Sequence, residues 1–283
     1  MSWGRPQNLL AGHADSGADY YHPIYFSSSS DPVFELDATM GWGRASIEGH
    51  RIRIPDAARP AGGGDGHLAV VTEDGWEYDL WAVSSKPSGG GRLEFGWGGR
   101  TRIDGDGLGS NATAAWFGLA AGVIRAPELE AGRIEHALFM GVRCTDAKQA
   151  ALFPAQPNTG EPCSEDGLSN VDAPPMGARF VLDMTAGEIA ALEVPDWKKT
   201  ILRALAEYGM FVGDAIGSGA WGLQFESGST YTSFGQPDRL ARFAENSRGV
   251  GTWNGMHVFN LADGIDWKNR LKVLHPCETQ QTC

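Results

Sequence analysis

The sequence has no long hydrophobic run and few basic residues. No apolar stretch approaches the roughly 20 residues that a helix needs to cross a bilayer, so we expect no membrane partner. Lysine and arginine number 23 against 35 aspartates and glutamates, for a net charge of −12. Nucleic-acid binding needs a clustered basic face. The arginines at 51 and 53, and at 100 and 102, are only pairs in alternating strand patterns. Solvated strand faces explain them better than an anion site, and no nucleic-acid partner is expected.

Common catalytic and leader motifs are also missing. The chain has no GxSxG elbow, no phosphate-binding loop and no HExxH zinc motif. Its first ten residues, MSWGRPQNLL, are too polar for the core of a secretory signal. We therefore interpret them as a mature start with an added methionine. Any site must be sought on the faces of the predicted strands.

Cysteine is scarce, and its four positions suggest two local loops. Cys144 and Cys163 bracket a polar, proline-rich stretch, whereas Cys277 and Cys283 bracket a short tail. Neither pair has the CxxC spacing of zinc ligands. Of the three pairings that four cysteines allow, disulfides 144–163 and 277–283 are the simplest. Disulfides persist in oxidising compartments, so the sequence predicts a secreted, extracellular protein.

Glycine, in contrast, is abundant, and most of the 39 glycines separate short apolar runs. This pattern is typical of many strands joined by tight turns. Residues 70–81 predict a hairpin with Asp74-Gly75 as its turn. Strands are predicted over residues 22–26, 32–38, 44–54, 67–71, 76–83, 92–98, 132–142, 174–184 and 210–216.

Helices are predicted to be few. An apolar stripe that starts at Trp197 with i, i+4, i+8 and i+11 spacing indicates a helix over 195–209. Thr185 and Glu188 have the spacing of a capping box. Residues 113–124 are apolar throughout, so we expect them to be buried as helix or strand. The predicted fold is mainly β: an antiparallel β-sandwich or jelly-roll-like single domain over 21–283, after an irregular segment over 1–20.

Two carboxylates on the predicted strand 76–83 form the principal candidate site. Side chains alternate along a strand, so Glu77 and Asp79 share a face with Trp81. Same-face neighbours stand about 6.5–7 Å apart. Glycosidases place their two carboxyl groups about 5–5.5 Å apart when they retain, and roughly 6.5–9.5 Å apart when they invert, the anomeric configuration. One carboxyl would be the acid with a raised pKa, and the other the base or nucleophile. The alternative is an exposed strand face with two ordinary acids.

His67 and His136 are further catalytic candidates. We expect His136 to face a polar cluster that contains His67 or Asp65. Glu135, on the other face of its strand, is expected to pair with an arginine such as Arg133, Arg143 or Arg179. A histidine that bonds a backbone carbonyl in the core is the commoner alternative. A metal site made by Asp65 with the two histidines lacks a recognisable ligand spacing.

Aromatic and basic side chains supply candidates for substrate binding. Aromatic faces stack on sugar rings, although core packing is the default for most of the ten tryptophans. The candidate substrate-binding residues are Trp81, Trp97, Arg100, Arg102 and Tyr25.

The stretch DGDGLGSN, residues 104–111, is similar to a loose calcium loop. Asp104, Asp106 and Asn111 would offer oxygen ligands to a structural Ca²⁺. The stretch lacks the full spacing and the closing glutamate of an EF-hand, and a glycine-rich turn explains it more simply. No other metal or cofactor is expected.

Five segments occur in an order that resembles a family of uncharacterised secreted bacterial proteins. They are GGGDGHLAVV, WEYDLW, GRIEHALFM, PPMGARFVLD and RALAEYGMFVGD, and the resemblance spans roughly residues 60–226. It implies a secreted bacterial origin, near polysaccharide-degrading systems. It attaches no activity and no catalytic residue.

These observations favour a secreted enzyme that acts on a polysaccharide or oligosaccharide. A glycoside hydrolase with Glu77 and Asp79 as its carboxyl pair is the first hypothesis. A polysaccharide lyase is the second: an arginine or histidine would neutralise a uronate, and a tyrosine or histidine would take the C5 proton. The residues that supply these types are Arg100, Arg102, His67, His136, Tyr25 and Tyr78. The negative net charge disfavours an acidic substrate unless the site is locally basic. A non-catalytic glycan-binding protein is the third hypothesis.

Overall fold

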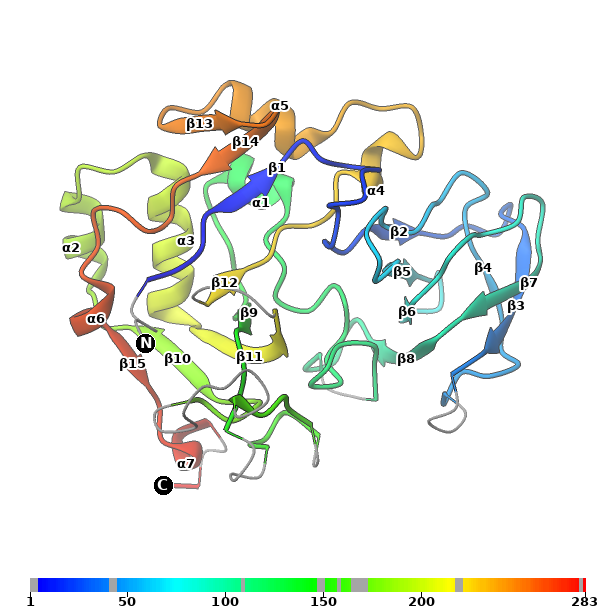
Figure 1. Ribbon diagram of the computed structural model, residues 1–283, viewed down its shortest axis with the longest axis horizontal. Coiled ribbons are helices and arrows are strands. Elements are labelled where there is room, and N and C mark those ends of the chain that lie inside the picture. Colours follow the sequence, from blue (N-terminus) through cyan, green and yellow to red (C-terminus); the bar gives the residue numbers. More distant parts are fainter. Residues whose placement is uncertain are drawn as a thin grey trace. The chain divides into compact units, whose positions relative to one another are not determined.

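The computed structural model describes residues 5–40, 45–107, 110–146, 151–156, 159–163, 173–216, 221–279 and 282–283 (Figure 1). Strands hold 28% of the chain and helices 17%, which confirms a mainly β fold with a few short helices. In the part of the chain described, no helix is long and apolar enough to span a membrane. The sheets are not closed on themselves, and the sandwich or jelly-roll arrangement stays a prediction.

The chain forms two compact units. The first unit comprises Met1–Leu10, Gly122–Gln224 and Phe243–Cys283, and the second comprises Ala11–Ala121 and Phe225–Arg242. A single domain over 21–283 stays a prediction.

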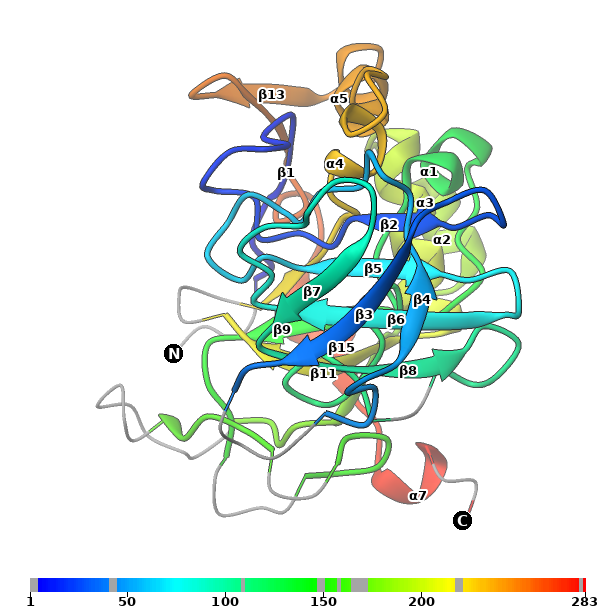
Figure 2. The same ribbon diagram turned by 90° about the vertical axis from the view of Figure 1, so that its right-hand side faces the viewer.

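The second unit holds two sheets (Figure 2). The four-stranded sheet has the order β2 (Ile24–Phe26), β5 (Leu68–Val71), β6 (Trp76–Trp81) and β8 (Trp97–Arg102). The three-stranded sheet has the order β4 (Arg51–Arg53), β3 (Val33–Ala38) and β7 (Gly91–Phe95). The predicted hairpin is confirmed, because β5 and β6 pair antiparallel across Gly75, whose φ of 81° suits glycine. The pairs β2–β5 and β3–β7 are parallel, so the expectation of a purely antiparallel architecture is wrong for them.

The core of the second unit lies between side chains of both sheets. Along the hairpin, Leu68, Val70, Tyr78 and Leu80 point into this core, as strand alternation requires. Residues 69, 71, 77 and 79 therefore point to the other face of the sheet. Further core residues are Tyr25, Phe34, Leu36, Ala45, Ile47, Ile52, Ile54, Ala58, Val83, Leu93 and Phe95. The segment that returns from the end of the chain adds the short helix α4 (Ser229–Thr232).

The first unit contains a five-stranded sheet and most of the helices. The sheet has the order β12 (Gly222–Leu223), β9 (Leu138–Val142), β11 (Met210–Ala215), β10 (Arg179–Leu182) and β15 (Leu271–Val273). A further sheet has the order β1 (Leu9–Ala11), β14 (Met256–Phe259) and β13 (Val250–Trp253). The helices are α1 (Ala126–Ala131), α2 (Ala186–Ala191), α3 (Asp196–Glu207), α5 (Arg239–Glu245), which crosses the unit boundary, α6 (Trp267–Arg270) and α7 (Pro276–Thr279).

The helix predicted over 195–209 is confirmed as α3. It begins after Pro195 and ends at Tyr208, followed by Gly209 with a φ of 76°. The capping box is confirmed as well, because Thr185 accepts from the Glu188 backbone while the Glu188 side chain accepts from Thr185.

Three predicted elements need correction. The strand expected over 132–142 begins only at Leu138, where pairing with β11 starts. Gly132 caps α1 in a left-handed conformation, and residues 133–137 connect the helix to the strand. Within 44–54 only 51–53 form a strand, and residue 44 lies outside the described residues. Residues 113–124 are largely buried, as expected, but form neither helix nor strand.

Both predicted disulfides are confirmed. Cys144 bonds Cys163 with Cα atoms 4.9 Å apart, and Cys277 bonds Cys283 with Cα atoms 5.2 Å apart. All four cysteines are paired, which fits a protein exported to an oxidising compartment.

Candidate functional site

Strand β6 carries a carboxyl pair on one face. Glu77 lies opposite Val71 of β5, and Asp79 lies opposite Ala69, so the two acids share a face as alternation predicts. Glu77 is only 8% exposed and Asp79 is 0% exposed. They are therefore not an ordinary solvated strand face.

Backbone amides from residues 111–120 cover this pair. Leu119 N–H donates to Asp79 Oδ2 at 2.9 Å, and Ala120 N–H donates to Glu77 Oε1 at 2.8 Å. The two carboxyl groups also hydrogen-bond to each other, and the Asn111 side chain hydrogen-bonds Asp79. A Cβ at Gly118 would lie 2.9 Å from Glu77 Oε1, so glycine allows the segment to approach this closely.

The electrostatics of the pair fit one shared proton. Burial, the neighbouring charge of Glu77 and the hydrogen bond with Glu77 raise the pKa of Asp79 well above its ordinary value. An acid of raised pKa beside a second carboxylate is what a two-carboxylate mechanism requires. However, groups in hydrogen-bond contact are closer than the about 5–5.5 Å that retaining glycosidases use.

Two buried histidines adjoin the carboxyl pair. His67 precedes β5 on the same face as Ala69, and its ring centroid lies 4.4 Å from that of His22. His22 Nδ1–H donates to the carbonyl of Leu119 at 2.5 Å. Burial lowers the pKa of His67 to about 4 despite its hydrogen bonds to the backbone at residues 20 and 21. The ring is therefore neutral at pH 7.

Asp65 and Trp81 lie at the end of the same hairpin. Trp81 Nε1–H donates to Asp65 Oδ1 at 3.2 Å. Trp81 lies opposite Trp97 of β8, and the Trp97 ring centroid is 5.8 Å from that of Trp116. Two candidate substrate-binding residues, Trp81 and Trp97, therefore lie side by side, and Trp116 lies next to Trp97.

His136 lies in the first unit, whereas its expected partners His67 and Asp65 lie in the second, so that contact stays a prediction. Within its own unit, His136 bonds Glu128 of α1 through Nε2 and the Ala137 carbonyl through Nδ1, both at 2.9 Å. Burial opposes its charge, but these hydrogen bonds raise its pKa. Glu135 pairs with Arg133, as predicted.

On the opposite face of β6, a Tyr78 cluster forms from Trp76, Tyr78, Arg100 and His50. Tyr78 lies directly opposite Arg100 of β8. Arg100 Nη1–H donates to Tyr78 Oη at 3.1 Å, and His50 Nδ1 lies 3.3 Å from the same oxygen. Arg100, His50 and Trp76 are half-buried, while Tyr78 is 5% exposed.

The charges of the Tyr78 cluster favour a neutral His50. Burial, followed by the charge of Arg100, lowers the pKa of His50. One ring nitrogen of a neutral imidazole accepts a hydrogen bond and the other donates one. In the tautomer whose Nδ1 accepts, the Tyr78 hydroxyl donates to His50, and a chain runs from Arg100 through Tyr78 to His50.

Two guanidinium groups lie near the ring of Trp76. The Arg100 guanidinium carbon lies 4.1 Å from the Trp76 ring centroid, and that of Arg102 lies 5.3 Å from it. Arg102 also pairs with Asp104 at 2.9 Å. Of the expected calcium ligands, Asp104 takes part in this ion pair and the Asn111 side chain hydrogen-bonds Asp79. Residues 108 and 109 of that stretch lie outside the described residues, and the calcium site stays a prediction. In the described residues, no group of three or more His, Cys, Asp or Glu is arranged to hold a metal ion.

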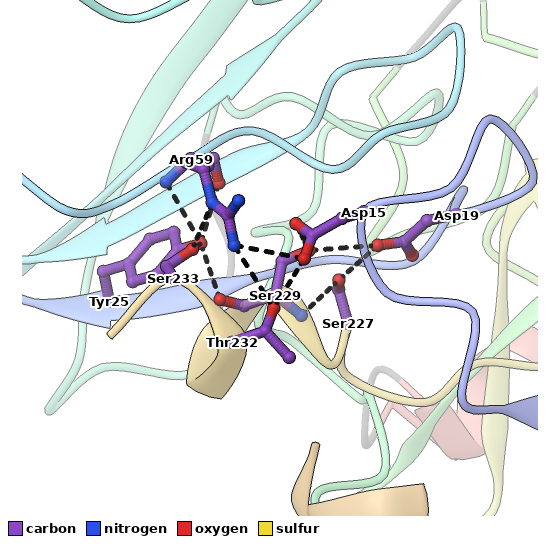
Figure 3. Close-up of polar contacts among 8 residues, drawn as sticks. All are labelled: Asp15, Asp19, Tyr25, Arg59, Ser227, Ser229, Thr232 and Ser233. Atoms are coloured by element: carbon purple, nitrogen blue, oxygen red, sulfur yellow. Dashed lines mark hydrogen bonds and ion pairs between the residues drawn. The ribbon is translucent and has the colours of Figure 1, made fainter. Parts of the chain in front are cut away.

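Tyr25 lies within a polar network of the second unit rather than at its surface (Figure 3). It is 1% exposed, and its hydroxyl donates to the carbonyl of Arg59 at 2.7 Å or of Ser229 at 3.0 Å. The network also contains Asp15, Asp19, Ser227, Thr232 and Ser233. Because it joins residues 15–59 to residues 227–233, it fastens the returning segment to the rest of the unit.

No family model, no curated protein and no solved structure matches this chain. The resemblance to secreted bacterial proteins stays a prediction. The site is therefore judged on its geometry alone. The sequence analysis missed His50 and the role of Trp76: strand parity places Trp76 with Tyr78, but no local pattern places His50 beside them.

Proposed function

We propose that this protein is a secreted carbohydrate-active enzyme that cleaves an acidic polysaccharide by β-elimination at the Tyr78 cluster. The observation that carries the proposal is the position of the Tyr78 hydroxyl, between the Arg100 guanidinium and the His50 imidazole. A uronate lyase needs a cation for the sugar carboxylate and a base for the C5 proton. Arg100 and His50 are half-buried and meet at the hydroxyl of the buried Tyr78.

Each residue of the cluster has a role in this chemistry. Arg100 pairs with the uronate carboxylate, which stabilises the charge that develops when C5 loses its proton. Tyr78 Oη takes that proton as its own proton passes to His50. The C5–H electrons form the C4–C5 double bond as the C4–O4 bond breaks. The proton on His50 returns through Tyr78 to the departing O4.

Local charge supports an acidic substrate in a protein whose net charge is −12. Arg51 follows His50 directly, and Arg102 lies beside Arg100 over Trp76. Asp104 neutralises Arg102, whereas Arg100 has no ion pair within the described ranges. Arg100 is therefore the cation for the substrate, and Trp76 supplies an apolar surface beside it.

The test is a screen of the purified protein on acidic and neutral polysaccharides. Ultraviolet absorbance of unsaturated products and reducing ends are followed together. We expect absorbance on a uronate polymer, lost by at least about 100-fold in Tyr78→Phe. Tyr208→Phe is the matched control, and circular dichroism checks the fold of both. Full activity in Tyr78→Phe would refute the assignment.

Hydrolysis by Glu77 and Asp79 is a second candidate. It is favoured by the raised pKa of Asp79 beside a second carboxylate on a face that also carries Trp81. Here the screen would give reducing ends without absorbance. That activity would be lost in Glu77→Gln and retained in Tyr78→Phe. Binding to one polymer with neither ultraviolet absorbance nor new reducing ends would indicate a glycan-binding protein instead.

A further inference from the structure

Residues 111–120 form a strap across the carboxyl face of β6. The strap has no helix or strand, and it is compacted by its own turns: Trp116 N–H donates to the Thr113 carbonyl at 2.8 Å, and Phe117 N–H donates to Thr113 Oγ1 at 2.7 Å. The strap packs through its buried side chains Ala115, Phe117 and Leu119, and polar side chains of the sheet also bond its backbone.

Three hydrogen bonds fasten the C-terminal end of the strap. Asp79 accepts from the amide of Leu119, and Glu77 accepts from the amide of Ala120. His22 donates to the carbonyl of Leu119. At the other end, Asn111 is 0% exposed and donates to Thr101 Oγ1 at 3.4 Å. Two of the three fastenings at Leu119 and Ala120 thus use the carboxyl pair.

The carboxyl pair tolerates one negative charge better than two. A hydrogen bond between two carboxyl groups requires that one of them holds a proton. If that proton leaves, two charges meet in a site that is at most 8% exposed. The other titratable groups near the strap are His22, His67 and Asp65, and burial keeps both histidines neutral. A neutral histidine does not compensate a second negative charge, and two charges in a buried carboxyl pair are costly.

The strap also contains backbone strain. Trp116 has a φ of 70°, a left-handed conformation that is rare for a large side chain. Such a residue costs on the order of 1–3 kcal/mol and persists only while its surroundings hold it. Strain therefore favours release once the fastenings weaken.

We propose that Glu77 and Asp79 are a pH-dependent latch: their shared proton keeps the strap closed, and its loss frees the strap and exposes both carboxylates. The inference is independent of the lyase proposal, because the Tyr78 cluster lies on the opposite face of β6.

The test is hydrogen exchange of the Leu119 and Ala120 amides between about pH 5 and about pH 9, corrected for the intrinsic exchange rate. In the wild type we expect their protection to fall by at least about tenfold as pH rises. The amide of Ala69, which bonds the Pro23 carbonyl in the same unit, is the internal control. Protection that does not change with pH would overturn the proposal.

Asp79→Asn is the matched variant. Its carbonyl oxygen still accepts from Leu119, and its amide N–H replaces the shared proton with one that does not titrate. We expect protection of both amides to persist at all pH values. Glu77→Gln makes the same replacement from the other side and serves if Asp79→Asn does not fold. A fall in protection equal to that of the wild type in the folded variant would refute the latch.

Discussion

The hydroxyl of Tyr78 lies 3.1 Å from Nη1 of Arg100, across the antiparallel pair of β6 and β8. The same guanidinium lies over the ring of Trp76, 4.1 Å from its centroid. Arg100 is thus held by an aromatic face and a hydroxyl rather than by a carboxylate. Its charge remains for a ligand, which is why the Tyr78 cluster supports binding of an acidic sugar better than the buried carboxyl pair does.

Replacement of Arg100 by lysine should separate charge from geometry. Lysine keeps the positive charge but loses the planar fork that contacts Tyr78 and stacks on Trp76. We expect kcat/KM on a uronate polymer to fall by about 10- to 100-fold in Arg100→Lys. In Arg100→Met, which has no charge, kcat/KM should fall further. Arg203→Lys on α3 is the control. Equal activity of both Arg100 variants and the wild type would exclude Arg100 from the site.

The pH dependence of activity should report His50. Burial and Arg100 lower the pKa of His50, so the neutral form that accepts from Tyr78 persists below the ordinary histidine pKa. We expect kcat/KM to be constant near pH 7 and to fall only on the acid side of about 6.5. His50→Gln should reduce activity and remove this acid limb. An unchanged acid limb in His50→Gln would assign the titration to another group.

Buried His67 should make the second unit less stable in acid. Its pKa is about 4 in the folded protein and near 6.5 when unfolded, so the unfolded state binds more protons between these values. The contribution of His67 to the free energy of unfolding is fully present above about pH 6.5. It declines by roughly 3 kcal/mol as pH falls to 4.

Urea unfolding at a series of pH values measures this effect. Because burial also lowers the pKa of His22, the wild type should lose more stability than His67 accounts for alone. In His67→Gln the loss of unfolding free energy between about pH 6.5 and 4 should be smaller than in the wild type by the roughly 3 kcal/mol that His67 contributes. An identical pH dependence in the variant would show that His67 is protonated, or exposed, in the folded state.

Tyr25→Phe should destabilise the second unit without changing its surface. The hydroxyl of Tyr25 donates a hydrogen bond to the carbonyl of Arg59 or of Ser229, and its removal leaves these acceptors without that donor. The expected loss is about 1–3 kcal/mol in urea unfolding. Tyr20→Phe is the control, because Tyr20 is 50% exposed and should change stability by less than about 0.5 kcal/mol. Equal effects of the two substitutions would contradict the role of the network.

The sequence by itself determined the features that depend on neighbouring residues. The β5–β6 hairpin, the helix α3, the Thr185 capping box and the two short-range disulfides follow from turn residues, periodicity and spacing. Strand alternation also placed Glu77 and Asp79 on one face and Trp76 and Tyr78 on the other.

Only the tertiary structure decided what meets these faces. The strap reaches Asp79 from 40 residues away and Glu77 from 43 residues away and buries the carboxyl pair, while His50 reaches Tyr78 from 28 residues away. Contacts of this kind depend on how distant segments pack together, and no local periodicity encodes that packing.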